Sequence, residues 1–143
     1  MKDDNCIFCK LAAGEIPSNT LYEDTDFRVI MDISPAVKGH AIVLPKQHMN
    51  DLLEVETDTA AKALFVVSKV ANAVKDALGC EGINILQNNG EAAGQSIFHL
   101  HFHVLPRFHE DRFTIPWKPL SYAEGEAEEI AGKIRAVIQK HKS

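Results

Sequence analysis

The segment His99-Leu100-His101-Phe102-His103-Val104-Leu105-Pro106-Arg107 places three imidazoles at alternate positions with apolar residues between them. Side chains of a β-strand point alternately to opposite faces of a sheet, so the pattern predicts a strand with the histidines on one face. Leu100, Phe102 and Val104 would then enter the core. A helix would scatter the three histidines around its axis. Aromatic and β-branched residues at the intervening positions, and Pro106 at the end, also favour a strand.

Three histidines on one strand face form a chemically capable surface. A neutral imidazole offers one hydrogen-bond donor and one acceptor and titrates near neutrality, which suits a nucleophile, a proton carrier or a metal ligand. The plain alternative is a polar strand face whose histidines have no chemical role. Strict alternation of three histidines favours the chemical interpretation over this alternative.

The histidine run resembles the signature of the histidine triad (HIT) superfamily and is most similar to its Hint-like nucleotide-binding branch. Other segments resemble family landmarks in the same order along the chain: Cys6-Ile7-Phe8-Cys9, Gly14-Glu15-Ile16-Pro17, Asp32-Ile33-Ser34-Pro35, Gly39-His40, Leu44-Pro45-Lys46-Gln47-His48 and Gly94-Gln95-Ser96. The resemblance covers about residues 5–107, with 108–143 as a less characteristic C-terminal extension. It implies a single HIT domain over residues 1–143 and a symmetric homodimer.

Size and composition exclude several classes of protein. The chain has 143 residues and a net charge of −5, and its basic residues form no block longer than a pair. This pattern argues against a nucleic-acid-binding surface, but a single nucleotide needs only a few local donors. No long apolar run follows the N-terminal residues, no segment is long enough to span a bilayer, and there are only three cysteines. These features predict a cytoplasmic protein without a membrane segment.

Other segments predict the remaining elements of the fold. Apolar runs bounded by glycine, proline or asparagine indicate strands at about 27–33, 39–45 and 82–88. The apolar period then changes to that of a helix running from Thr57 to Leu78, with Thr57-Asp58 as its N-cap. Residues 121–124 have capping-box spacing and predict a C-terminal helix. The expected fold class is α+β, with an antiparallel sheet of about five strands, one long helix and a C-terminal helix.

Asp32 lies at the end of the first predicted strand. A carboxylate there can accept hydrogen bonds from the two hydroxyls of a ribose, and a turn-initiating aspartate explains the position equally well. The family resemblance favours the ribose contact. It also implies apolar walls for the base, contacts to phosphate oxygens and a catalytic set. The base-pocket residues are Ile16, Ile30 and Ile33, and the phosphate contacts are Asn88 and Ser96. Further nucleotide-binding residues are Gln95, His101 and His103. The catalytic set is His40, Ser96, His99, His101 and His103.

The resemblance assigns nucleophilic attack to His101 and makes His103 a hydrogen-bonding partner near the transferred phosphate. An imidazole nitrogen can displace a leaving group at phosphorus and so divide a difficult hydrolysis into two steps. The expected function is a hydrolase or transferase acting at the α-phosphate of a purine nucleotide, with an AMP-like ligand and no catalytic metal. Adenosine phosphoramidates and dinucleoside polyphosphates both fit. A nucleotide-binding regulatory module with incidental catalysis and a purely structural zinc protein remain alternatives.

Cys6 and Cys9 have the spacing that lets two thiolates bind one zinc ion or form a redox disulfide. A thioredoxin-like site needs a strand before the cysteines, and only five residues precede Cys6. The metal interpretation is therefore favoured, provided that two more ligands come from elsewhere. Similar bacterial family members carry the same cysteine pair with two histidines, so the resemblance implies a structural zinc (Zn) site formed with His48 and His99.

Overall fold

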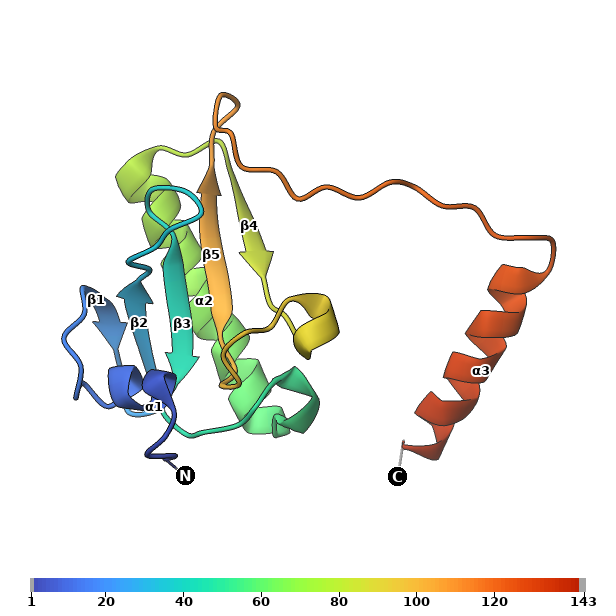
Figure 1. Cartoon of the computed structure of the whole chain (residues 1–143), viewed down its shortest axis with the longest axis horizontal. Helices are drawn as coiled ribbons and strands as arrows, with labels where there is room; N and C mark the ends of the chain where they lie inside the picture. Colours follow the sequence, from blue (N-terminus) through green and yellow to red (C-terminus); the bar gives the residue numbers. More distant parts are fainter. Residues whose placement is uncertain (1, 142–143) are drawn as a thin grey trace. The chain divides into compact units, whose positions relative to one another are not determined.

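The computed structural model describes residues 2–141, which contain one five-stranded antiparallel sheet in the order β1-β2-β3-β5-β4 (Figure 1). The strands are β1 (Thr20–Glu23), β2 (Phe27–Met31), β3 (Ala41–Pro45), β4 (Gly82–Leu86) and β5 (Phe102–Arg107). The α-helices of the described residues are α1 (Ile7–Ala12), α2 (Thr57–Leu78) and α3 (Glu126–Lys140). The predicted α+β class, with about five strands, one long helix and a C-terminal helix, is confirmed.

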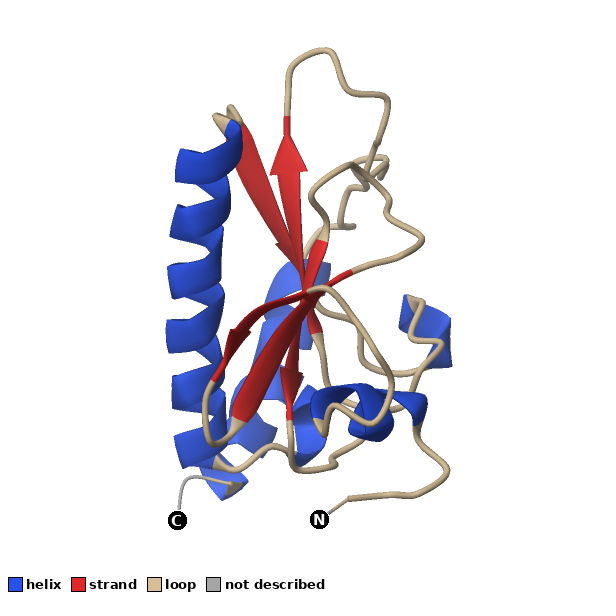
Figure 2. Ribbon diagram, turned by 90° about the vertical axis from the view of Figure 1, so that its left-hand side faces the viewer, coloured by secondary structure: helices blue, strands red, loops and turns tan. Residues whose placement is uncertain are grey.

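The sheet separates two apolar layers, because alternate residues of its central strands point to opposite faces. On one face, β2, β3 and β5 pack against α2. The residues that form this layer include Phe27, Val29, Ala41, Val43, Phe102 and Val104 of the sheet and Ala63, Val66, Val67, Val70 and Val74 of α2. On the other face, Phe8 and Ala12 of α1 pack against Ile30, Ile42 and Leu44. Figure 2 shows α2 running along the sheet.

The bounds of α2 agree with the prediction, but its N-cap does not. Thr57 is the first helical residue, and Glu56 precedes it in an extended conformation without a side-chain capping bond. The helix ends at Gly79, whose φ of +65° is a backbone conformation that glycine adopts without strain. Leu64 and Phe65 remain 61% and 65% exposed on the helix, so part of its apolar surface is uncovered in the single chain.

The strand that carries the histidines begins later than the sequence predicts. β5 begins at Phe102, so His99 and His101 lie in the irregular segment that precedes it. The pairing of β5 with β3 stops at Phe102 and Val43. Further along β3, Pro45 has no N–H to extend the ladder, and its carbonyl accepts a hydrogen bond from the His99 ring instead. The prediction of one continuous strand over the three histidines was therefore wrong.

The chain divides into two compact units, one ending at Phe113 and the other beginning at Thr114. The second unit contains α3, whose described residues include none that is buried. The helix begins at Glu126, later than the predicted capping box at 121–124, and the Glu126 carboxylate accepts the backbone N–H of Ala123 at 2.9 Å. A single domain over 1–143 remains a prediction. None of the helices described is both long enough and apolar enough to cross a bilayer.

Candidate active site

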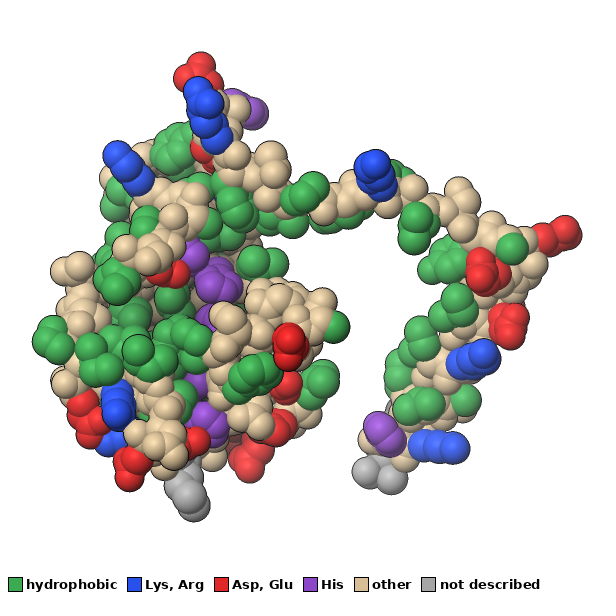
Figure 3. Space-filling model, in the orientation of Figure 1, with side chains coloured by type: hydrophobic (Ala, Val, Ile, Leu, Met, Phe, Trp, Pro, Cys, Tyr) green, Lys and Arg blue, Asp and Glu red, His purple; other side chains and the backbone are tan. Residues whose placement is uncertain are grey.

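The catalytic histidines predicted from the sequence gather on the sheet face that is turned away from α2. His103 lies in β5 and pairs in register with Ile42 of β3 and Leu86 of β4. The ring centroids of His101 and His103 are 4.9 Å apart, and those of His40 and His103 are also 4.9 Å apart. Figure 3 shows histidine side chains in a hollow on this face, with apolar side chains beside them. The sheet thus brings together His103 of β5, His101 from the segment before β5 and His40 from the position before β3.

The ring of His101 has one nitrogen engaged and one free. Its Nδ1 lies 2.7 Å from the backbone carbonyl of His99, and a carbonyl oxygen can only accept a hydrogen bond. Nδ1 therefore carries the hydrogen, and Nε2 keeps its lone pair. Phe8 of α1 packs against the ring at 4.9 Å between centroids in an edge-on arrangement. Burial lowers the pKa of His101 below its usual value, which favours the neutral, nucleophilic form at pH 7.

His40 fixes the hydrogen position on His103. The backbone N–H of Ala36 donates to Nδ1 of His40 at 3.1 Å, so the hydrogen of the neutral His40 ring lies on Nε2. This Nε2 is 2.8 Å from Nδ1 of His103, which must then be the acceptor. His103 consequently carries its own hydrogen on Nε2. Burial lowers the pKa of His103 to about 4 and also lowers that of His40, so both rings are neutral at pH 7.

Asp32 has one oxygen engaged in a turn and the other directed toward the histidines. Its Oδ1 accepts the backbone N–H of Ser34 at 2.8 Å, and its Oδ2 lies 3.6 Å from Nε2 of His40. The turn-initiating interpretation is therefore correct for Oδ1. Oδ2 remains available to a ligand, because the side chain is only partly buried.

The remaining residues predicted to bind nucleotide differ widely in exposure. Ile30 is buried in the layer beneath α1, whereas Ile33 is 89% exposed. Ile16 and Asn88 are half-buried, and Ser96 is exposed. The positions of these five residues are compatible with ligand contacts, which remain predictions. Gln95 differs from them, since its side chain is 3% exposed and both ends of its amide are bonded within the protein.

The four predicted metal ligands converge from different parts of the chain. Cys6, Cys9, His48 and His99 each offer one ligand atom, and these atoms all lie within 4.8 Å of one another. The Sγ atom of Cys9 is 3.3 Å from Nδ1 of His48 and 3.4 Å from Nδ1 of His99. The Sγ atom of Cys6 also lies 3.4 Å from Nδ1 of His99. Two sulfur and two imidazole donors form the set that tetrahedral zinc prefers.

The hydrogen bonds of the two ligand histidines fit the same interpretation. Nε2 of His99 lies 2.8 Å from the carbonyl of Pro45, and Nε2 of His48 lies 3.2 Å from Oδ1 of Asn50. Both partners are acceptors, so each ring carries its hydrogen on Nε2 and directs the Nδ1 lone pair at the sulfurs. Metal-bound histidines usually donate their second nitrogen in this way. Both nitrogens of His99 are thus engaged within the candidate metal cluster of Cys6, Cys9, His48 and His99. Its backbone carbonyl accepts the hydrogen bond from His101.

A second cluster with ligand atoms equally close together is formed by Asp32, His40 and His103. Its hydrogen bonds argue against a metal site. Nδ1 of His40 accepts a backbone N–H, so a cation on Nε2 would have to displace the only hydrogen of the ring and leave an imidazolate. We therefore interpret His40 and His103 as a hydrogen-bonded relay, with the Asp32 carboxylate beside it at 3.6 Å from His40.

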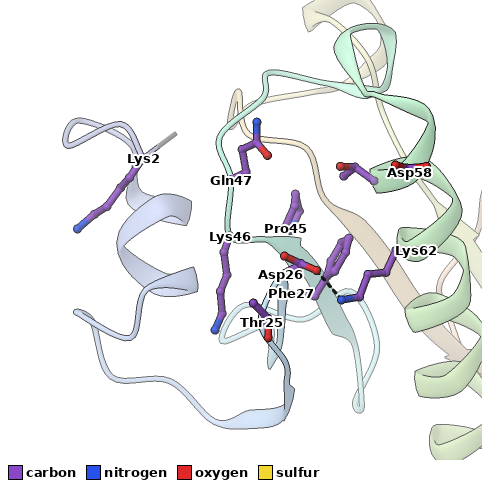
Figure 4. Close-up of a pocket in the computed structure, with 10 residues that line it drawn as sticks. Lys2, Thr25, Asp26, Phe27, Pro45, Lys46, Gln47, Asp58 and Lys62 are labelled. Atoms are coloured by element: carbon purple, nitrogen blue, oxygen red, sulfur yellow. Dashed lines mark hydrogen bonds and ion pairs between the residues drawn. The ribbon is translucent and has the colours of Figure 1, made fainter.

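A separate cavity of about 460 Å³ lies between the ends of β2 and β3 and the start of α2 (Figure 4). Three lysines line it, but each is paired with a carboxylate. Lys46 contacts Glu23 at 2.6 Å, Lys62 contacts Asp26 at 2.5 Å, and Lys2 is paired with Glu15. Because these cations are already neutralised, this cavity is a poorer phosphate site than the histidine cluster.

Sequence reasoning missed two contributors to these sites. Phe8 packs on His101 and lies between Cys6 and Cys9 in the sequence. Its place between two candidate ligands was the sequence feature that could have indicated a position close to the histidines. Asn50, which orients His48, lies two residues beyond that ligand. An amide so close to a predicted metal ligand is a reasonable candidate for its hydrogen-bond partner.

Comparisons with known proteins agree with this architecture. The family model described as HIT domain matches residues 13–110, which include the five strands, α2 and the three histidines. The chain is 45% identical over 116 residues to Protein hit from Bacillus subtilis (strain 168), and the match covers 80% of each chain. It is 40% identical over 136 residues to adenosine 5'-monophosphoramidase hnt1 from Schizosaccharomyces pombe, covering 92% of this chain and 99% of that protein. The crystal structure of SMU.412c from Streptococcus mutans UA159 matches with a TM-score of 0.92 at 39% identity, covering 96% of this chain and 87% of that one.

Proposed function

Because this chain belongs to the HIT domain family, we propose that it is a nucleotide hydrolase or transferase in which Nε2 of His101 attacks the α-phosphate of a purine nucleotide. The observation that carries the proposal is the pair of fixed hydrogen positions in the histidine cluster. The carbonyl of His99 leaves a lone pair on Nε2 of His101, and His40 leaves a hydrogen on Nε2 of His103. A nucleophile therefore lies beside a hydrogen-bond donor.

The proposed reaction has two steps. In the first, Nε2 of His101 forms a bond to phosphorus, and the leaving group departs with the electron pair of its own bond and takes up a proton from solvent, which the second step returns. Nε2–H of His103 donates to a phosphate oxygen, whose negative charge it stabilises. In the second step, water attacks phosphorus, loses a proton and displaces His101, which releases a nucleoside monophosphate and restores the neutral ring.

Substrate binding is assigned to residues around this cluster. We propose that Oδ2 of Asp32 accepts hydrogen bonds from ribose hydroxyls, because this oxygen is open and Oδ1 is held by the turn. Asn88 and Ser96 would contact phosphate oxygens. The base would lie against the apolar side chains of Ile16, Ile30 and Ile33. An AMP-like ligand is supported by the Schizosaccharomyces pombe relative, which is named an adenosine 5'-monophosphoramidase.

We further propose that Cys6, Cys9, His48 and His99 hold a structural zinc ion. Bound there, zinc would supply a closed four-ligand centre that joins α1 to the segment preceding β5 and leaves no position for substrate. The chemistry at phosphorus would be carried by the protein side chains alone. In this proposal His99 acts on catalysis only through its carbonyl, which keeps His101 in the reactive tautomer.

The family resemblance also leads us to propose a cytoplasmic, symmetric homodimer. Leu64 and Phe65 expose apolar surface on α2 that a second copy would cover. Sedimentation velocity at micromolar concentration tests this state. A dimer is expected, and a stable monomer would overturn the proposal.

Turnover and binding, measured separately, test the proposed function. Release of AMP from an adenosine phosphoramidate and from diadenosine tetraphosphate should be readily measurable for the wild type and absent for His101→Ala. Calorimetry should show that His101→Ala binds AMP within a few fold of the wild type, because the ribose and base contacts lie elsewhere. If AMP binds but the wild type shows only incidental turnover, the chain is a nucleotide-binding regulatory module. If His101→Ala keeps turnover near the wild-type rate, His101 is not the nucleophile. If no nucleotide binds, the purely structural zinc protein is the better account.

A further inference from the structure

Gln95 is a buried amide that the proposed chemistry does not use. It lies in the loop between β4 and β5, one residue before Ser96, and its side chain is 3% exposed. Its Oε1 accepts the backbone N–H of Gly90 at 2.7 Å. Its Nε2 donates to the carbonyls of Asn50 at 2.7 Å and Ile97 at 3.2 Å. The amide therefore links Gly90 to Ile97 within the loop and also links the loop to Asn50, which follows His48.

Asn50 connects Gln95 to the metal cluster. Its backbone carbonyl accepts the bond from Gln95, and its side-chain Oδ1 accepts from Nε2 of His48 at 3.2 Å. Its Nδ2 donates to the carboxylate of Glu54 at 3.1 Å. A carboxylate can only accept here, so Glu54 fixes the orientation of the Asn50 amide. That orientation in turn keeps the Nδ1 lone pair of His48 directed at the cysteine sulfur.

Two further hydrogen bonds join the same segments. The N–H of Leu100 donates to the carbonyl of Met49 at 2.8 Å, and the N–H of Leu52 donates to Oδ1 of Asn89 at 2.8 Å. The segment that begins at His48 is therefore hydrogen-bonded to residues on both sides of Ser96. Asn89 and Gln95 are the partners before Ser96, and Leu100 is the partner after it. Movement of this loop would displace Asn50, and movement of Asn50 would change the orientation of His48.

We propose that Gln95 and Asn50 are positioning residues that couple the metal cluster to the loop that carries Ser96. Gln95 would not contact the nucleotide, in contrast to the role that the family resemblance implies for it. The inference rests on the proposed function, which places Ser96 at the phosphate. Coupling between two binding sites is reciprocal, so metal bound at the cluster should strengthen nucleotide binding, and bound nucleotide should slow metal release.

Cobalt substitution gives a readout that does not depend on turnover. The full-length protein is loaded with Co²⁺, and the rate of metal transfer to excess EDTA is followed by absorbance, with and without saturating AMP. Gln95→Leu removes the amide at nearly constant size and should release Co²⁺ at least about threefold faster, although it removes no ligand. Asn50→Ala removes the partner of His48 and should weaken metal binding by about 10- to 100-fold. AMP should slow release from the wild type and have little effect on release from Gln95→Leu.

The absorption spectrum and a stability control separate coupling from general destabilisation. The cobalt bands of Gln95→Leu should keep their wild-type positions, because the same four ligands remain. The matched control is Val74→Ala, which removes core volume from the C-terminal part of α2, near Tyr22 and Met31. It should lower thermal stability but leave the release rate and the AMP effect unchanged. If it accelerates release as much as Gln95→Leu does, the effect is general and the proposal is wrong.

Two other outcomes bear on the proposal. Wild-type release rates in both Gln95→Leu and Asn50→Ala would overturn it; Asn50 is exposed, so its substitution is compatible with folding if Gln95→Leu is not. Failure of the wild type to bind AMP in calorimetry would instead refute the proposed function. In that case the release rates without AMP still decide whether the loop supports the metal cluster.

Discussion

His40 offers a quantitative test of the histidine relay. Its side chain is 5% exposed and lies behind His103, with Nδ1 bonded to the N–H of Ala36 and Nε2 bonded to His103. In His40→Ala, Nδ1 of His103 loses its donor, so both neutral tautomers of that ring become populated. The proposed nucleophile keeps its own acceptor, because the bond from His101 to the carbonyl of His99 does not involve His40.

The size of the effect follows from the single interaction that is lost. A neutral intramolecular hydrogen bond contributes about 0.5 to 1.5 kcal/mol net, which corresponds to roughly a two- to tenfold change in rate. We expect kcat for an adenosine phosphoramidate to fall within this range while KM changes little, because His40 is shielded from solvent. In contrast, His101→Ala should remove turnover altogether.

Steady-state kinetics and nitrogen NMR together test whether His40 acts by fixing the tautomer of His103. Nitrogen-15 shifts of His103 should indicate one tautomer in the wild type, with hydrogen on Nε2, and a mixture in His40→Ala. A loss of kcat as complete as that of His101→Ala would refute the reasoning, since His40 would then be a reacting group. If His40→Ala changes neither kcat nor the His103 tautomer, the hydrogen bond from His40 does not control His103, and the reasoning is also refuted.

Three further predictions concern the metal cluster, the nucleotide site and acid stability. The double variant Cys6→Ala with Cys9→Ala should bind no zinc by metal analysis, and its thermal stability should fall much more than its kcat. When the free metal concentration is about a thousand times the Kd, metal binding contributes about 4 kcal/mol to the free energy of unfolding, or roughly 10 °C in Tm. Full zinc retention by this variant would contradict the site. Asp32→Ala should weaken AMP binding by about 1.5 to 3 kcal/mol in calorimetry, because charge-assisted hydrogen bonds are lost, and unaltered affinity would remove Asp32 from the ribose site. Burial lowers the pKa of His103 from 6.5 to about 4, so the unfolded chain binds more protons between these values and the free energy of unfolding should fall as the pH is lowered through that window. His103→Asn should flatten this slope in denaturant titrations, and an identical slope would show that His103 does not contribute.

Local patterns were sufficient to predict most of the sheet and the long helix. The apolar runs of β2, β3 and β4 and the bounds of α2 follow from residue periodicity and from the residues that end each element. β1 was missed because Thr20–Glu23 is a short edge strand whose residues are mostly exposed, so it has no buried face to produce a pattern. The late start of β5 was missed because the alternation of apolar residues and histidines predicts only which face each side chain occupies. Where the strand begins depends on the backbone hydrogen bonds that β3 offers, and these stop at Phe102.

The candidate site could be predicted as a set of residues but not as a geometry. Cysteine spacing suggested a metal, yet the approach of Cys9 to both His48 and His99 depends on how α1 and the segment before β5 fold together. The hydrogen positions of His101 and His103 depend on a carbonyl and on His40, whose roles no local pattern shows. Similarly, Gln95 resembles a ligand-binding residue in sequence, and only its buried hydrogen bonds indicate a supporting role.

Trapping the covalent intermediate tests the central claim most directly. The wild type is mixed with an adenosine phosphoramidate for a single turnover, quenched in alkali to preserve the acid-labile phosphorus–nitrogen bond, digested and sequenced by mass spectrometry. The account predicts one adenylyl group on His101, with no adduct in His101→Ala. An adenylyl group on another residue, or AMP release without any adduct during that turnover, would contradict it.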